Sequence, residues 1–140
     1  MTTLNYQPMP AVNQAPKGTL WTGRIISLIP ILMLLFSAVL KFVKPPSIVQ
    51  EFTRLGYAEH HAVVLGILEL GCTIIYAIPA TSILGAILLT GYLGGAMASH
   101  VRIGSPLFTH TLFGLYLGLM VWGGLWLRDR NLRSLIPFRR

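Results

Sequence analysis

The sequence predicts an all-α integral membrane protein that folds as a four-helix antiparallel bundle. Of its 140 residues, 54% are hydrophobic and only 11% are charged, whereas soluble domains carry roughly 25% charged residues. Four apolar stretches have the roughly 17 to 25 residues that a helix needs to cross a bilayer. These predicted spans cover about residues 20–42, 61–78, 81–99 and 107–127. Short links join the second span to the third and the third to the fourth, which favours antiparallel neighbours.

Polar tails flank the predicted bundle of residues 20–127. The first tail, residues 1–19, contains three prolines, and we interpret it as disordered. We expect no signal peptide, because this tail is long and no small-residue cleavage site follows a short apolar core. The second tail, residues 128–140, is basic.

The basic residues predict the orientation of the bundle. With alternating spans, seven of the eleven basic residues fall on the side of the two termini. The positive-inside rule therefore places both termini and both tails in the cytoplasm, and we expect a multi-pass protein of a bacterial inner membrane. The net charge of +7 would suggest nucleic acid for a soluble protein. Because these charges flank spans, we expect the lipid bilayer and its anionic headgroups as partners, and no nucleic acid.

The outer loop between the first two spans predicts a short interfacial helix. Pro45 and Pro46 stop the first span, and the segment that follows has apolar residues at helical spacing. We expect Ser47 to be the N-cap of this helix and Gly56 to end it.

Two GxxxG motifs indicate close helix packing in the third and fourth spans. Gly91 and Gly95 form the first motif, and Gly114 and Gly118 form the second. Small residues let helix backbones approach closely in lipid. The glycines predict packing between these two spans, with a homo-oligomer or another membrane protein as the alternative partner.

Glu69 is an acid in the middle of the second span. A charge at this depth is costly and usually has a partner. Lys41 ends the first span, and antiparallel helices bring it to the same end of the bundle. We therefore predict that Lys41 and Glu69 are charge partners, with His100, Tyr92 or Tyr76 completing a buried polar cluster. The cluster either fixes the register of the helices or lines an outward-opening pocket.

Other chemistries have little support in the sequence. Cys72 is the only cysteine, which excludes an internal disulfide and a four-cysteine zinc site. Four histidines fall on the predicted outer side, but their spacing matches no common ligand pattern, so we predict no metal site. There is no P-loop, dinucleotide fingerprint or nucleophile elbow, and no cofactor is evident from motifs.

Four segments in this order resemble the DoxX-like family of small four-helix membrane proteins. They are FSAVLKFVKPP, LGILELGCTIIYAIP, GAILLTGYLGGAMASHVRIG and WLRDRNLRSLIPFRR. The resemblance covers roughly residues 20–138. The family pattern of a lysine, a glutamate and a His-x-Arg maps onto Lys41, Glu69, His100 and Arg102.

The resemblance implies several functions. Some family members are named for a subunit of a thiosulfate:quinone oxidoreductase, and others are associated with membrane redox complexes. It therefore implies an accessory subunit of a quinone-linked membrane redox system, with a buried Lys-Glu-His polar site and a quinone as cofactor. Two alternatives remain, a non-catalytic assembly or stabilising factor and a small-molecule binding protein with an outward-facing pocket. Catalytic activity stays open in this reading.

Overall fold

The computed structural model describes residues 17–129 and 132–133. The described part of the chain is helical, and four of its segments are long and apolar enough to cross a membrane. They confirm the predicted all-α, four-span architecture. The expected tail of residues 1–19 falls almost entirely outside the described residues, as does most of the tail of residues 128–140. The helices, with the turns η1 and η2, are α1 (Lys17–Val43), α2 (Pro46–Arg54), α3 (His60–Ala77), η1 (Pro79–Thr81), α4 (Ser82–Arg102), η2 (Leu107–Thr111) and α5 (Phe113–Arg128).

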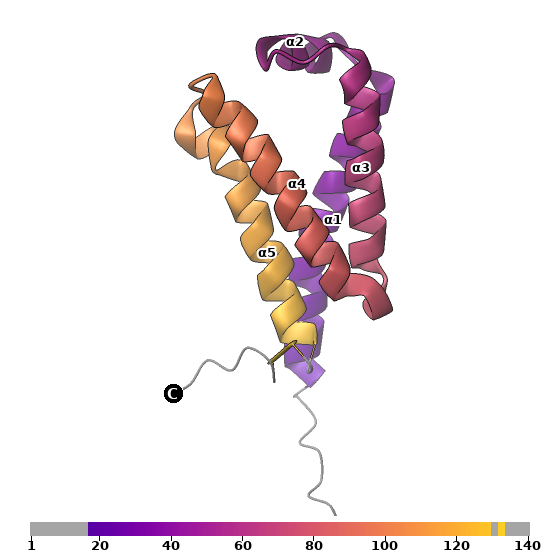
Figure 1. The fold of residues 1–140 in the computed structure, drawn as a ribbon. Coiled ribbons are helices and arrows are strands. Elements are labelled where there is room, and N and C mark those ends of the chain that lie inside the picture. The colour runs from indigo at the N-terminus through magenta and orange to yellow at the C-terminus, as the bar shows by residue number, and fades with distance from the viewer. Residues whose placement is uncertain (1–16, 130–131, 134–140) are drawn as a thin grey trace, which may run out of the picture.

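The four long helices form a closed ring of neighbours. α1 packs against α3 and α5, and α4 packs against α3 and α5. The first residues of α1 and the last residues of α5 lie at one end of the bundle, with the α3–α4 turn (Figure 1). α2 lies at the other end. Below, these are called the terminal end and the α2 end.

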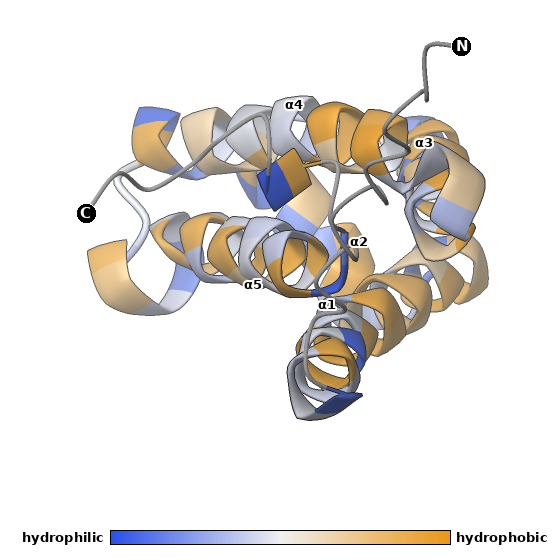
Figure 2. Cartoon of the chain, turned by 90° about the horizontal axis from the view of Figure 1, so that it is seen from below, coloured by the Kyte–Doolittle hydropathy of each residue, from blue (hydrophilic) through white to orange (hydrophobic). Residues whose placement is uncertain are grey.

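The outer surface of the bundle is apolar. Large hydrophobic side chains such as Leu32, Phe36, Ile67 and Leu119 are more than half exposed, and hydrophobic stretches cover all four long helices (Figure 2). The buried cluster lies between the helices and includes Tyr76, Leu89, Val121 and Leu125. Exposed apolar residues on all four long helices are what a bundle surrounded by lipid requires.

Glycines determine where the helices approach most closely. At the terminal end, Gly23 and Gly124 bring α1 against α5, and Gly85 brings α4 against the backbone of Tyr76 in α3. At the α2 end, Gly66 lies against Lys41, so there α1 stays close to α3.

Gly114 lies against Met97 and the Leu93 carbonyl, which holds α5 close to α4 at the α2 end. The close contacts therefore join the pair α1/α3 to the pair α4/α5 at the terminal end only. Toward the α2 end, the two pairs diverge (Figure 1).

The predicted interfacial helix is α2, but its start differs from the prediction. Pro45 occupies the N-cap position and no side chain caps the helix, so Ser47 is not the N-cap. Pro46 is instead the first helical residue, where its fixed φ suits a helix and its missing N–H costs no hydrogen bond. Gly56 ends the helix as predicted, with φ 77°.

The Gly85 contact generates a stability prediction. An added methyl group in Gly85→Ala would collide with the backbone of Tyr76, and such overpacking typically costs about 1–3 kcal/mol. Gly118→Ala is the matched control, because no heavy atom of the described residues lies within 4 Å of that added carbon. In detergent, we expect a lower thermal unfolding midpoint for Gly85→Ala than for Gly118→Ala. Equal midpoints would contradict the packing described here.

Candidate functional site

An ion pair between α1 and α3 lies inside the bundle. Lys41 Nζ is 2.8 Å from Glu69 Oε2, and the side chains are 13% and 3% exposed. Lys41 also donates a hydrogen bond to Ser37 Oγ, one turn earlier in α1, at 2.7 Å. Glu69 lies roughly 13 Å along α3 from His60, at about 1.5 Å rise per residue. An acid at this depth needs a cation, and Lys41 supplies it.

Tyr92 brings α4 to the same carboxylate. Its hydroxyl interacts with Glu69, and its side chain lines the same cavity as Lys41 and Glu69. The structure therefore brings together three of the residues predicted to form the polar cluster, one from each of α1, α3 and α4.

A cavity of about 830 Å³ extends from this cluster toward the α2 end. It occupies the space that the diverging helix pairs leave. Most of its lining is apolar, and Phe36, Phe52 and Phe113 contribute aromatic rings. Gly91 and Gly95 also line it. Ligand sites in proteins are typically apolar cavities of roughly this size with a few convergent polar groups.

The glycine motifs therefore differ in what they do within the chain. Gly114 makes the close approach described above. A Cβ at Gly91, Gly95 or Gly118 would meet no heavy atom of the described residues within 4 Å. Inside this bundle, Gly91 and Gly95 leave room in the cavity and do not form a helix contact.

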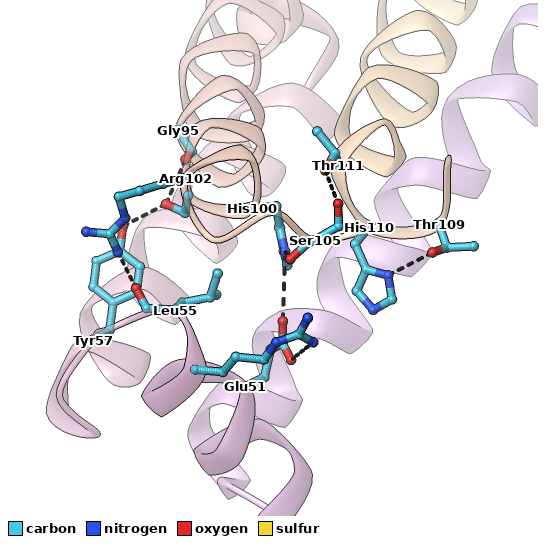
Figure 3. Close-up of polar contacts among 12 residues, drawn as sticks. Glu51, Leu55, Tyr57, Gly95, His100, Arg102, Ser105, Thr109, His110 and Thr111 are labelled. Atoms are coloured by element: carbon cyan, nitrogen blue, oxygen red, sulfur yellow. Dashed lines mark hydrogen bonds and ion pairs between the residues drawn. The ribbon is translucent and has the colours of Figure 1, made fainter. Parts of the chain in front are cut away.

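His100 lies at the α2 end of the cavity, away from the Lys41–Glu69 pair. Its Nδ1 is 3.2 Å from Ser105 Oγ and 3.8 Å from Glu51 Oε1, and its ring centroid is 5.8 Å from that of His110. Figure 3 shows Glu51 of α2 pointing toward His100 of α4. His100 shares the cavity with Lys41 and Glu69 but contacts other polar groups.

Arg102 and Tyr57 attach the α2 segment to α4 (Figure 3). Arg102 Nη2 donates a hydrogen bond to the carbonyl of Leu55. The Tyr57 hydroxyl lies 2.8 Å from Ser99 Oγ, and Ser99 in turn donates to the Gly95 carbonyl at 3.0 Å. Because Phe52 and Leu55 are buried and line the cavity, α2 forms its roof.

Tyr76 belongs to a different cluster, at the terminal end. Its hydroxyl donates to the Val121 carbonyl at 2.8 Å and lies 3.0 Å from Ser27 Oγ. Arg128 donates to the Tyr76 carbonyl at 3.2 Å, and its guanidinium lies 5.0 Å from the centre of the Tyr76 ring. Fully buried Tyr76 thus joins α3 to α1 and α5, and it does not line the cavity.

Glu51 and Tyr57 are site residues that the sequence analysis did not select. A signal for Glu51 was available, because it falls in the apolar stripe of α2, three residues after Ile48 and four before Leu55. A carboxylate among buried apolar positions indicates a polar partner. Across residues 17–129 and 132–133, no three His, Cys, Asp or Glu side chains gather closely enough to hold a metal ion.

The comparison with family models agrees with this architecture. The model of the DoxX-like family matches residues 25–124. The chain belongs to the DoxX-like family. No curated protein and no solved structure matches it significantly. The matched range of this DoxX-like protein includes Lys41, Glu69, Tyr92, His100 and Arg102, so the whole cavity lies within the part that defines the family.

The ion pair predicts that removing its lysine costs more stability than removing its carboxylate. Lys41→Met leaves a carboxylate that is 3% exposed, and breaking a buried pair in this way costs about 3–5 kcal/mol. Glu69→Gln should cost less, because a long lysine side chain can extend to the water interface. The double variant should be more stable than Lys41→Met alone. Thermal unfolding in detergent measures all three, and strictly additive losses would rule out the pairing.

The attachment of α2 generates a second prediction. Arg102→Gln removes the donor to the Leu55 carbonyl, and a hydrogen bond from a charged group contributes about 1.5–3 kcal/mol. Hydrogen exchange of the amides of residues 47–54 should therefore become at least about tenfold faster, since about 1.4 kcal/mol corresponds to a factor of ten. Arg54→Gln is the matched control, because the Arg54 side chain is half exposed. Unchanged exchange in Arg102→Gln would show that α2 is held by other contacts.

Proposed function

We propose that this DoxX-like protein is an accessory subunit of a membrane redox system and binds the headgroup of a quinone in the cavity. Three observations support the proposal: the apolar character of the cavity, the donors at its floor, and its contact with the lipid-facing surface. Electron transfer to or from the quinone would belong to a partner protein. The role of this chain is then to bind and orient the quinone.

The donor at the floor of the cavity is the observation that carries the proposal. An ammonium group has three N–H donors, and Ser37 and Glu69 accept two of those of Lys41. The third can donate to the carbonyl oxygen of a quinone. The Tyr92 side chain lines the same cavity, and its hydroxyl interacts with Glu69, so it helps to hold the carboxylate that positions Lys41.

The walls of the cavity suit the rest of a quinone molecule. Phe36, Phe52 and Phe113 line it and can pack against a flat ring. Several lining residues are also more than half exposed, among them Phe36 at 66% and Ile87 at 55%. The cavity therefore borders the lipid, and an isoprenoid tail can leave it through this border.

We further infer that both termini lie in the cytoplasm of a bacterial cell. Seven of the eleven basic residues belong to the terminal end by the order of the spans, and positive charges favour the cytoplasmic side. In this orientation the α2 end and the mouth of the cavity face the outer side of the inner membrane.

Quinone binding can be tested with a cavity-filling variant. In Gly91→Leu, the added side chain would extend into the cavity without a backbone collision. We expect its affinity for decylubiquinone, measured by equilibrium dialysis of protein in nanodiscs, to fall about tenfold or more, a loss of about 1.4 kcal/mol. Gly118→Leu is the matched control: its added carbon is equally free of contacts, and Gly118 does not line the cavity. We expect it to bind like the unmodified protein.

Two results would contradict quinone binding. One is an unmodified protein that retains no decylubiquinone, and the other is equal affinity of Gly91→Leu and the unmodified protein. Loss of a co-purifying membrane protein in Gly118→Leu, with quinone affinity unchanged, would instead support an assembly factor that acts through the open glycine face of α5. Quinone binding therefore predicts that Gly91→Leu is the harmful substitution, whereas an assembly factor predicts that Gly118→Leu is.

A further inference from the structure

A polar recess lies at the terminal end of the bundle, whereas the cavity of the proposed quinone site, called the quinone cavity below, extends toward the α2 end. Its volume is about 220 Å³, several times the roughly 30 Å³ share of one water molecule. The residues that line it come from α1, from the start of α4 and from the end of α5: Arg24, Pro79, Ser82, Leu125, Arg128 and Asp129. The quinone cavity shares none of these residues.

The recess carries an excess of positive charge. Two guanidinium groups line it, with one carboxylate, that of Asp129. The wider surroundings have the same sign, because Glu51 and Glu59 belong to the α2 end, and the charge of Glu69, in the middle of α3, is balanced by Lys41. An anion in the recess is therefore favoured both by its nearest groups and by the field of this end of the protein.

Arg128 is held in a fixed orientation by the bundle. Its Nη2 donates to the Tyr76 carbonyl, and its guanidinium lies over the Tyr76 ring. Its Nε is buried and has no hydrogen-bond partner among the described residues. A buried donor without a partner is unfavourable, and Arg128 lines the recess, so an acceptor there can supply the missing partner.

The start of α4 adds a second source of positive potential. This helix of 21 residues begins at Ser82, and no side chain caps its N-terminus. Ser82 donates its hydroxyl hydrogen to the Pro79 carbonyl at 3.0 Å. The first-turn N–H groups and the helix dipole favour an anion at this position, beside Arg128 and Arg24.

We propose that this recess binds a phosphate group, and that the phosphate is the headgroup of an anionic phospholipid. Guanidinium groups match the geometry of phosphate oxygens. The recess lies at the terminal end, where α1 begins and α5 ends, and we place this end of the spans at the level of lipid headgroups. Trp21 lies beside Arg24 at this level, as interfacial tryptophans do. This site is independent of the quinone cavity, and either can exist without the other.

The test uses the full chain in nanodiscs and counts bound phosphatidylglycerol by native mass spectrometry. Arg24→Gln removes an exposed cation without disturbing the core, and we expect about fivefold weaker retention of phosphatidylglycerol, because the recess loses one guanidinium group and a hydrogen bond of about 1 kcal/mol to the phosphate. Lys17→Gln is the matched control, an exposed cation of the same helix that does not line the recess. It should have little effect.

A second variant changes retention in the opposite direction. Asp129→Asn removes the one carboxylate that lines the recess among the described residues. It keeps a side-chain oxygen to accept from the Leu132 amide, as Asp129 Oδ1 does at 3.1 Å. We expect it to retain phosphatidylglycerol more tightly. Loss of retention when inorganic phosphate is added would identify free phosphate as the ligand, and undiminished retention would identify the lipid. Equal effects of Arg24→Gln and Lys17→Gln, or no gain in Asp129→Asn, would overturn the site.

Discussion

The architecture depends on one ion pair placed at membrane depth. Glu69 is almost completely buried, and its charge is balanced by Lys41 at 2.8 Å. Because a lone carboxylate at this depth is costly, the pair fixes α1 against α3 and sets their register. Gly66, whose missing side chain makes room for Lys41, allows this approach. The same pair lines the cavity, so in the proposed function the structural and binding roles belong to the same atoms.

The cavity follows from where the helices can and cannot approach one another. Gly23, Gly85 and Gly124 close the terminal end, where fully buried Tyr76 ties three helices together. Toward the α2 end, the close glycine contacts between the long helices lie within the pairs α1/α3 and α4/α5, and the cavity lies between the pairs. α2 covers that space through Arg102 and Tyr57. The helices pack closely at the terminal end, whereas at the α2 end they enclose a cavity beneath α2. A ligand site benefits from such a scaffold, because packed elements hold its residues in place.

The sequence predicted the spans and the Lys41–Glu69 pair, because bilayer thickness and the cost of a buried charge leave few alternatives. It did not separate Tyr76 from Tyr92. Tyr76 is near Glu69 in the sequence, and Tyr92 lies on α4 at a similar height in the bundle. Only the hydrogen-bond partners of Tyr76, Ser27 and Val121, assign it to the terminal end. The glycine motifs were equally ambiguous. Gly91 and Gly114 each begin a GxxxG motif, yet Gly91 lines the cavity, whereas Gly114 makes a close helix contact. The start of α2 was misplaced because Ser47 suits an N-cap, whereas Pro46 suits the first helical position better.

The central claim is that Glu69 is an ionised carboxylate at the floor of a cavity that a quinone enters. Infrared difference spectroscopy of the protein in bilayers tests it most directly, with Glu69→Gln used to assign the band of this side chain. The account predicts that the substitution removes a carboxylate band and that this band shifts when decylubiquinone is added. A band of a protonated carboxylic acid that decylubiquinone leaves unchanged would contradict both the ion pair and its place in the binding site.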